Sequence, residues 1–144
     1  MTRWLSEPEM RAWKALVSRT YRLLGELDKE LQAEHGLTLA EYEVLVLLSE
    51  EPNHSARMTD LAARVNISPS GMTRRVDGLV RKGWVERAQC PEDRRGSFAV
   101  LTDEGFAQLR AAAPSHVRGV REHFVDQLSE RQLANLAAAL ERLD

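Results

Sequence analysis

The feature that most constrains the fold of this 144-residue chain is a pair of short helices with almost no chain between them. The first helix is predicted to begin at Thr59, because a threonine hydroxyl can accept from the free amides of a first helical turn. Asn66 tolerates a left-handed backbone better than most residues, so we expect a sharp reversal there, with Ile67 turned inward. Ser68 and Pro69 then form a strong start signal for the second helix. This spacing predicts a helix-turn-helix.

The second helix has one apolar face and one polar face. The apolar face consists of side chains at helical spacing, namely Met72, Val76, Leu79 and Val80. At the start of the helix, Ser70 and Gly71 are small enough to let the backbone come close to a DNA duplex. The hydrogen-bond donors that follow are Thr73, Arg74 and Arg75. Because arginine is the usual bidentate partner of guanine in the major groove, a DNA-reading helix is indicated. The alternative is an ordinary amphipathic helix with a solvated basic face.

A β-hairpin is predicted directly after Gly83, a residue type that commonly ends a helix. Residues 84–88 and 97–101 are two short runs of strand type, and the charged residues 89–96 separate them. The whole segment therefore reads as two helices followed by a β-ribbon with a charged tip.

The tip of this hairpin carries Arg94 and Arg95. Guanidinium groups at the end of a stiff ribbon suit the narrow minor groove of DNA, where the negative potential is enhanced. A free Asp93 would repel phosphate, so we expect it to pair with a neighbouring arginine and hold the loop in shape. The alternative is a solvated turn, since charged hairpin loops are common.

Residues 93–102 resemble the wing signature D-x-R-x-x-x-x-x-L-T of the multiple-antibiotic-resistance regulator (MarR) family of winged helix-turn-helix repressors. Residues 58–62 and 68–74 are similar to the helix pair of that family, and the overall length fits. The helix pair and the wing at this spacing form a fairly specific match, whereas either alone is weak. The resemblance implies that residues 68–75 enter the major groove, and we expect Thr59 of the first helix to contact DNA as well.

The resemblance has further implications for the wing and for regulation. It implies that Arg95 probes the minor groove and that Asp93 orients the wing. In the general mode of the family, a small, often aromatic or anionic ligand binds between the dimer helices and the winged domain. The aromatic residues available as lining are Trp13, Tyr21 and Tyr42, although aromatic residues of this kind are more often plain core.

Charge is distributed unevenly along the chain. Residues 57–96 carry nine Lys and Arg against five Asp and Glu, whereas the remainder carries eleven against seventeen, which gives the overall net charge of -2. A basic segment in a mildly acidic protein confines the attraction for phosphate to that segment. We therefore expect double-stranded DNA as a partner there and no contact between DNA and the acidic ends.

Four more helices are predicted from their start signals. Capping boxes at Ser6 and Thr38 open a long amphipathic helix that ends at Gly36 and a central apolar helix that ends before Pro52. A helix from Thr102 is expected to be interrupted or kinked at Pro114, and a last helix starts at Ser129. We therefore expect a mainly α fold with a small β-hairpin wing.

The terminal helices carry apolar stripes that one small domain does not use. Residues 1–36 and 103–144 are accordingly predicted to form a helical dimerisation region, and residues 37–102 the winged helix-turn-helix DNA-binding region of one compact domain. The alternative is packing wholly within one chain. A homodimer would hold two recognition helices about one helical turn, roughly 34 Å, apart and would require a pseudo-palindromic operator.

Other kinds of chemistry find little support. The four histidines are read as non-ligands, no nucleophile and base occur in a recognisable arrangement, and no phosphate loop is present, so we predict no enzyme, metal or cofactor. We expect no signal peptide or membrane span, and the single cysteine, Cys90, agrees with a reducing compartment, so a cytoplasmic location is expected. Cys90 lies near several arginines that could lower the pKa of its thiol.

These observations predict a dimeric, sequence-specific DNA-binding regulator, a repressor released by a phenolic or anionic ligand. Two alternatives stay open. One is a winged-helix module that binds another protein and keeps a basic wing only incidentally. The other is a redox-responsive regulator that acts through Cys90.

Overall fold

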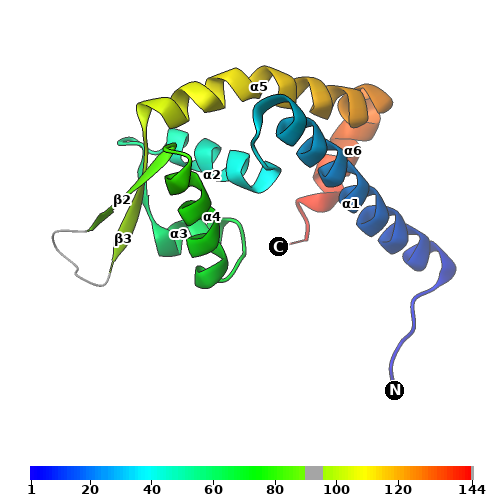
Figure 1. Cartoon of the computed structure of the whole chain (residues 1–144). Coiled ribbons are helices and arrows are strands. Elements are labelled where there is room, and N and C mark those ends of the chain that lie inside the picture. Colours follow the sequence, from blue (N-terminus) through cyan, green and yellow to red (C-terminus); the bar gives the residue numbers. More distant parts are fainter. Residues whose placement is uncertain (90–95, 144) are drawn as a thin grey trace.

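The computed structural model describes residues 1–89 and 96–143, which form a mainly helical fold with one small sheet (Figure 1). The prediction of a mainly α fold with a β wing is confirmed. The elements in chain order are α1 (Glu7–His35), α2 (Leu39–Glu50), β1 (Ser55–Arg57), α3 (Met58–Arg64), α4 (Pro69–Arg81), β2 (Val85–Gln89), β3 (Ser97–Leu101), α5 (Asp103–His123), the 3₁₀ turn η1 (Val125–Gln127) and α6 (Glu130–Leu140).

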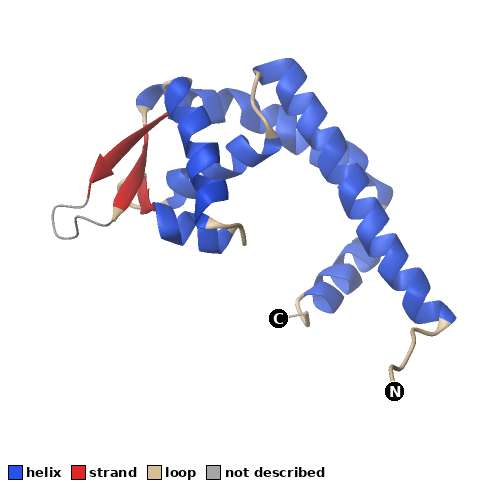
Figure 2. Cartoon of the chain, turned by 60° about the horizontal axis from the view of Figure 1, so that its bottom comes forward, coloured by secondary structure: helices blue, strands red, loops and turns tan. Residues whose placement is uncertain are grey.

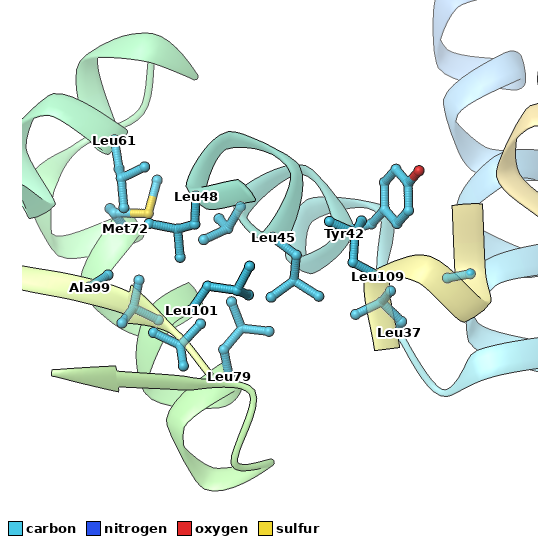
Figure 3. Close-up of a cluster of buried hydrophobic side chains, with 14 of the residues drawn as sticks. Leu37, Tyr42, Leu45, Leu48, Leu61, Met72, Leu79, Ala99, Leu101 and Leu109 are labelled. Atoms are coloured by element: carbon cyan, nitrogen blue, oxygen red, sulfur yellow. The ribbon is translucent and has the colours of Figure 1, made fainter. Parts of the chain in front are cut away.

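The hydrophobic core lies where α2, α3, α4 and the sheet meet. Figure 3 shows side chains from these elements converging, with Leu45 and Leu48 of α2 at the centre. Both are fully buried, as are Leu61 of α3 and Met72 and Leu79 of α4. Burial of a leucine-sized side chain contributes about 1.5–3 kcal/mol, so this cluster ties the helix pair firmly to α2 and the sheet.

The sheet has three antiparallel strands in the order β1-β3-β2. The predicted hairpin is present, with β2 and β3 paired from Val85 opposite Leu101 to Gln89 opposite Ser97. Strand β1, which pairs with the other edge of β3, was not predicted. Three residues are too few to display an alternating pattern, so only the pairing with β3 makes this segment a strand.

The turn between α3 and α4 has the predicted backbone. Asn66 is left-handed at φ 53°, and the amide of Ile67 donates to the carbonyl of Ala62 at 3.0 Å. Ser68 Oγ accepts from the Gly71 amide at 3.1 Å, which makes Ser68 the predicted N-cap of α4.

Two details of the helix pair were predicted wrongly. Thr59 does not cap α3, because the helix begins at Met58 after Arg57, which forms no side-chain cap. Strand β1 runs directly into α3, so the sheet sets the direction from which the chain enters the helix. Val80 was assigned to the apolar face of α4 but is 38% exposed, because it lies beyond the edge of the stripe formed by the buried residues.

Helices α1 and α5 lie side by side and are joined by polar contacts. Arg118 donates to Glu34 at 2.7 Å, His35 Nε2 lies 2.8 Å from Ser115 Oγ, and His123 bonds to Glu30. The hydrogen bond with Arg118 lowers the pKa of Glu34, and the hydrogen bond with Glu30 raises the pKa of His123. These contacts fasten the C-terminal half of α1 to the rest of the chain.

One of the two alternatives predicted for Pro114 was wrong. Pro114 does not interrupt α5, which runs unbroken from Asp103 to His123. Packing against α1 can hold such a helix together in spite of the missing amide, because tertiary contacts override local propensity.

The N-terminal half of α1 and helix α6 project from the winged region (Figure 2). Large apolar side chains on these and neighbouring segments are exposed in the single chain, including Leu5, Trp13, Leu16, Tyr21, Leu24, Val117, Leu140 and Leu143. Among the described residues, no helix is both long enough and apolar enough to cross a membrane.

Candidate nucleic-acid interface

The core determines which side of α4 is exposed. Met72, Val76 and Leu79 are buried, so Ser70 and Arg74 lie on the exposed side and Thr73 is half-buried at its edge. Ser68 Oγ lies 3.2 Å from Ser70 Oγ, so two hydroxyls cluster at the first turn beside the exposed Pro69. The start of α4 thus offers exposed hydroxyls, and Arg74 follows about one turn later.

Arg75 does not accompany Arg74 on the exposed face. Its Nη1 lies 3.6 Å from Glu43 Oε2 of α2, and only 28% of its side chain is exposed. The reason is visible in the spacing, because residue 75 lies three residues after Met72 and four before Leu79, within the apolar stripe. Arg75 was predicted to contact DNA from the polar face of α4, and this prediction of its position was wrong.

Of the remaining predicted residues, the structure describes only Thr59, which is exposed in the first turn of α3. On β2, Arg87 Nη2 lies 3.0 Å from Asp77 Oδ1 of α4, which ties the helix to the sheet. Asp93, Arg94 and Arg95, together with Cys90, lie outside the described residues, and their predicted roles stay predictions.

A cleft of about 850 Å³ lies behind α4, between α1, α2 and α5. Tyr21 and Tyr42, which were predicted to bind a ligand, both line it. Trp13 does not line it and is 57% exposed, because it lies about two turns nearer the start of α1 than Tyr21. Arg75 and His116 are lining residues that the sequence analysis did not assign to a ligand.

Two of the residues that line the cleft each have a polar atom that is buried without a hydrogen-bond partner among the described residues, Arg75 Nη1 and His116 Nδ1. The ring of His116 lies 4.5 Å from that of Tyr42, centroid to centroid. Burial lowers the pKa of His116 and raises that of Tyr42, so both are uncharged at neutral pH. The cleft therefore presents one guanidinium and two neutral hydrogen-bonding rings, a set suited to an aromatic molecule that bears an anionic group.

Two short helices joined by a tight turn and followed by the β-hairpin of a small antiparallel sheet define a winged helix-turn-helix protein. The model of the MarR family matches residues 37–97. The chain is 33% identical over 114 residues to the HTH-type transcriptional repressor YetL of Bacillus subtilis, covering 77% of this chain and 68% of YetL. The chain belongs to the MarR family, whose members are transcription regulators and not enzymes.

Solved structures agree with this assignment over almost the full length. AbsC, a MarR family transcriptional regulator from Streptomyces coelicolor, is 40% identical with a TM-score of 0.92, covering 99% of this chain and 95% of AbsC. Sco3205, from the same organism and solved in complex with DNA, is 38% identical with a TM-score of 0.94, covering 99% of this chain and 89% of Sco3205. The similarity thus extends over the terminal helices as well as the winged region.

Proposed function

We propose that the chain is a homodimeric, sequence-specific repressor that inserts α4 into the major groove of a pseudo-palindromic operator. The observation that carries this proposal is the exposed start of α4, where Ser70 and Arg74 project from a helix whose other face is anchored in the core. The DNA complex of the similar protein Sco3205 supports it. A regulator of this kind works in the cytoplasm, where its operator is.

Within this proposal the contacts divide into two groups. Thr59, Ser68 and Pro69 approach the phosphate backbone, while Ser70, Thr73 and Arg74 reach base edges. The wing tip inserts Arg95 into the minor groove, with Arg94 beside it on the phosphates and Asp93 holding the loop. Arg75 leaves this set, because its side chain lines the cleft.

The homodimer is supported by the exposed apolar side chains on the terminal helices. Trp13, Leu16 and Leu24 face solvent on α1, and Leu140 and Leu143 do so at the end of the chain. Apolar surface of this extent is costly to hydrate, and a second copy of the chain would cover it. A two-fold pair would also set the distance between the two α4 helices.

This proposal is tested by measuring stoichiometry and salt dependence together. Sedimentation is expected to give a dimer, and fluorescence anisotropy is expected to show one dimer bound per palindromic duplex. The logarithm of the binding constant should fall with log salt at a slope of about -0.9 per phosphate contacted. A protein that captures another protein at a salt concentration that abolishes DNA binding would instead favour the interaction-module alternative.

We further propose that a small aromatic anion binds in the cleft and releases the operator. Arg75 of α4 and Glu43 of α2 lie close together at the cleft, and Tyr21 and Leu24 of α1 line the same cleft. The contact between Arg75 and Glu43 is long, at 3.6 Å, so its loss alone should disturb α4 little. An anion that hydrogen-bonded to the Arg75 guanidinium would instead draw α4 toward the bound ligand and would thereby change the position of α4 relative to α1 and α2. Such a ligand acts only through the difference between its affinities for the two arrangements.

Replacing Arg75 with glutamine is expected to uncouple ligand response from DNA binding. Operator affinity without ligand should change by less than about threefold, because Arg75 does not lie on the exposed face, whereas release by a hydroxybenzoate should need about ten times more ligand, as expected for a lost charged hydrogen bond. Anisotropy titration of the preformed complex measures both quantities.

Arg118→Gln is the matched control, since Arg118 also pairs with a glutamate of another helix, Glu34 of α1, at 2.7 Å, and both residues lie outside the cleft. It should leave the ligand response unchanged. An unaltered ligand response in Arg75→Gln would contradict the role given to this guanidinium.

A further inference from the structure

The residue directly after α4 connects three helices through one side chain. Lys82 Nζ donates to the carbonyl of Gly36 at 3.0 Å and to Glu41 Oε1 and Oε2 at 3.0 and 2.8 Å. An ammonium group has three N–H donors, so these acceptors use all of them. The same cation lies 5.0 Å from the centre of the Trp84 ring. The end of α1, the start of α2 and the end of α4 thus meet at this ammonium group, a cluster we call the Lys82 joint.

The partners of Lys82 are themselves held in place by backbone. Gly36 is the left-handed C-cap of α1, and Glu41 belongs to the capping box of α2, where its Oε2 accepts from the Thr38 amide at 3.0 Å. Only 13% of the Glu41 side chain and 36% of the Lys82 side chain are exposed. The pair therefore differs from Lys29–Glu26 on α1, where 73% and 43% are exposed and solvent competes freely.

We propose that Lys82 is a positioning residue for operator recognition, which sets the tilt of α4 relative to α1 without contacting DNA. This inference rests on the proposed function of α4. The helix has 13 residues and so spans about 20 Å. A tilt of about 10° at its C-terminal end would move its N-terminal, base-contacting end by about 3 Å, the length of a whole hydrogen bond. A small change of angle at the Lys82 joint thus becomes a larger displacement at the end of α4 that is proposed to contact the bases.

The test compares operator affinity with affinity for a scrambled duplex in Lys82→Met, which keeps an unbranched side chain of similar length and removes the charge. The ratio of the two affinities should fall about tenfold, a loss similar to that of one mismatched base pair. Lys82→Arg should recover most of the ratio, since a guanidinium can still reach Glu41. Lys29→Met removes the same charge from a glutamate-paired lysine and should leave the ratio unchanged.

A second measurement follows the distance between α1 and α4 in the absence of DNA. Spin labels at the exposed positions Ala33 and Ser70, on a background with Cys90→Ser and diluted with unlabelled chain, report the separation of α1 and α4. Lys82→Met should broaden or shift this distance distribution, and Lys29→Met should not. The inference would be overturned if Lys82→Met left the distance distribution unchanged. It would also be overturned if the wild-type protein prefers its operator and Lys82→Met leaves the affinity ratio unchanged. Equal affinity of wild-type protein for both duplexes would contradict the proposed function instead.

Discussion

Arg74→Glu is expected to lower operator affinity by about three orders of magnitude. Losing one bidentate arginine–guanine contact costs about 1–3 kcal/mol, and the proposed two-fold dimer loses it at both half-sites. The new carboxylate adds repulsion from the neighbouring phosphates. Arg74 is exposed on the outer face of α4, so the fold itself should be unaffected. Anisotropy at fixed salt measures the affinity, and circular dichroism checks the helix content.

Arg110→Glu makes the same charge change on α5 and serves as the control. Arg110 is exposed and its guanidinium lies 6.0 Å from the Phe106 ring, on the helix that crosses the top of Figure 1, away from the start of α4. Its operator affinity should stay within about threefold of wild type, since distant surface charges are screened at physiological salt. Equal losses in the two variants would mean that overall charge, and not a contact by Arg74, governs binding.

Gly105→Ala is expected to destabilise the fold strongly, and more than Gly119→Ala on the same helix. Gly105 lies in the first turn of α5 and packs directly on the backbone of Trp84. A Cβ there would lie 2.8 Å from the Trp84 carbonyl carbon and 2.9 Å from Leu101 Cδ1, and it would clash with the Trp84 carbonyl oxygen. We expect a loss of about 3 kcal/mol, at the upper end for an overpacked site, because backbone cannot move aside as a side chain can.

Urea unfolding at a fixed protein concentration measures this loss, since dimerisation would make stability depend on concentration. Gly119→Ala is the control on the same helix. Its Cβ would meet the Glu30 carboxylate and Leu27 Cδ2, which are the ends of side chains that can shift. That variant should lose about 1 kcal/mol or less, because alanine also favours the helix. Equal losses would show that the backbone contact at Gly105 has no special role.

Local signals predicted most helix ends. The capping boxes at Ser6, Thr38 and Ser129 are all present, and each works within one turn of backbone, so nearby residues suffice to specify it. Asn66 is likewise left-handed where the turn required it. The cleft was only half predicted. Tyr21 and Tyr42 stand out as aromatic, but Arg75 was assigned to the wrong face of its helix.

The amino-acid order alone determined the helices, the reversal between α3 and α4 and the family resemblance, because caps, turns and apolar spacing act between neighbours in the chain. Only the folded chain decided that residues 55–57 form a strand, that α5 continues through Pro114 and that Lys82 meets Gly36 and Glu41. Each of these depends on a partner more than 40 residues away, or on packing between whole helices. Such contacts leave no periodic trace in the sequence, so tertiary structure was needed to find them.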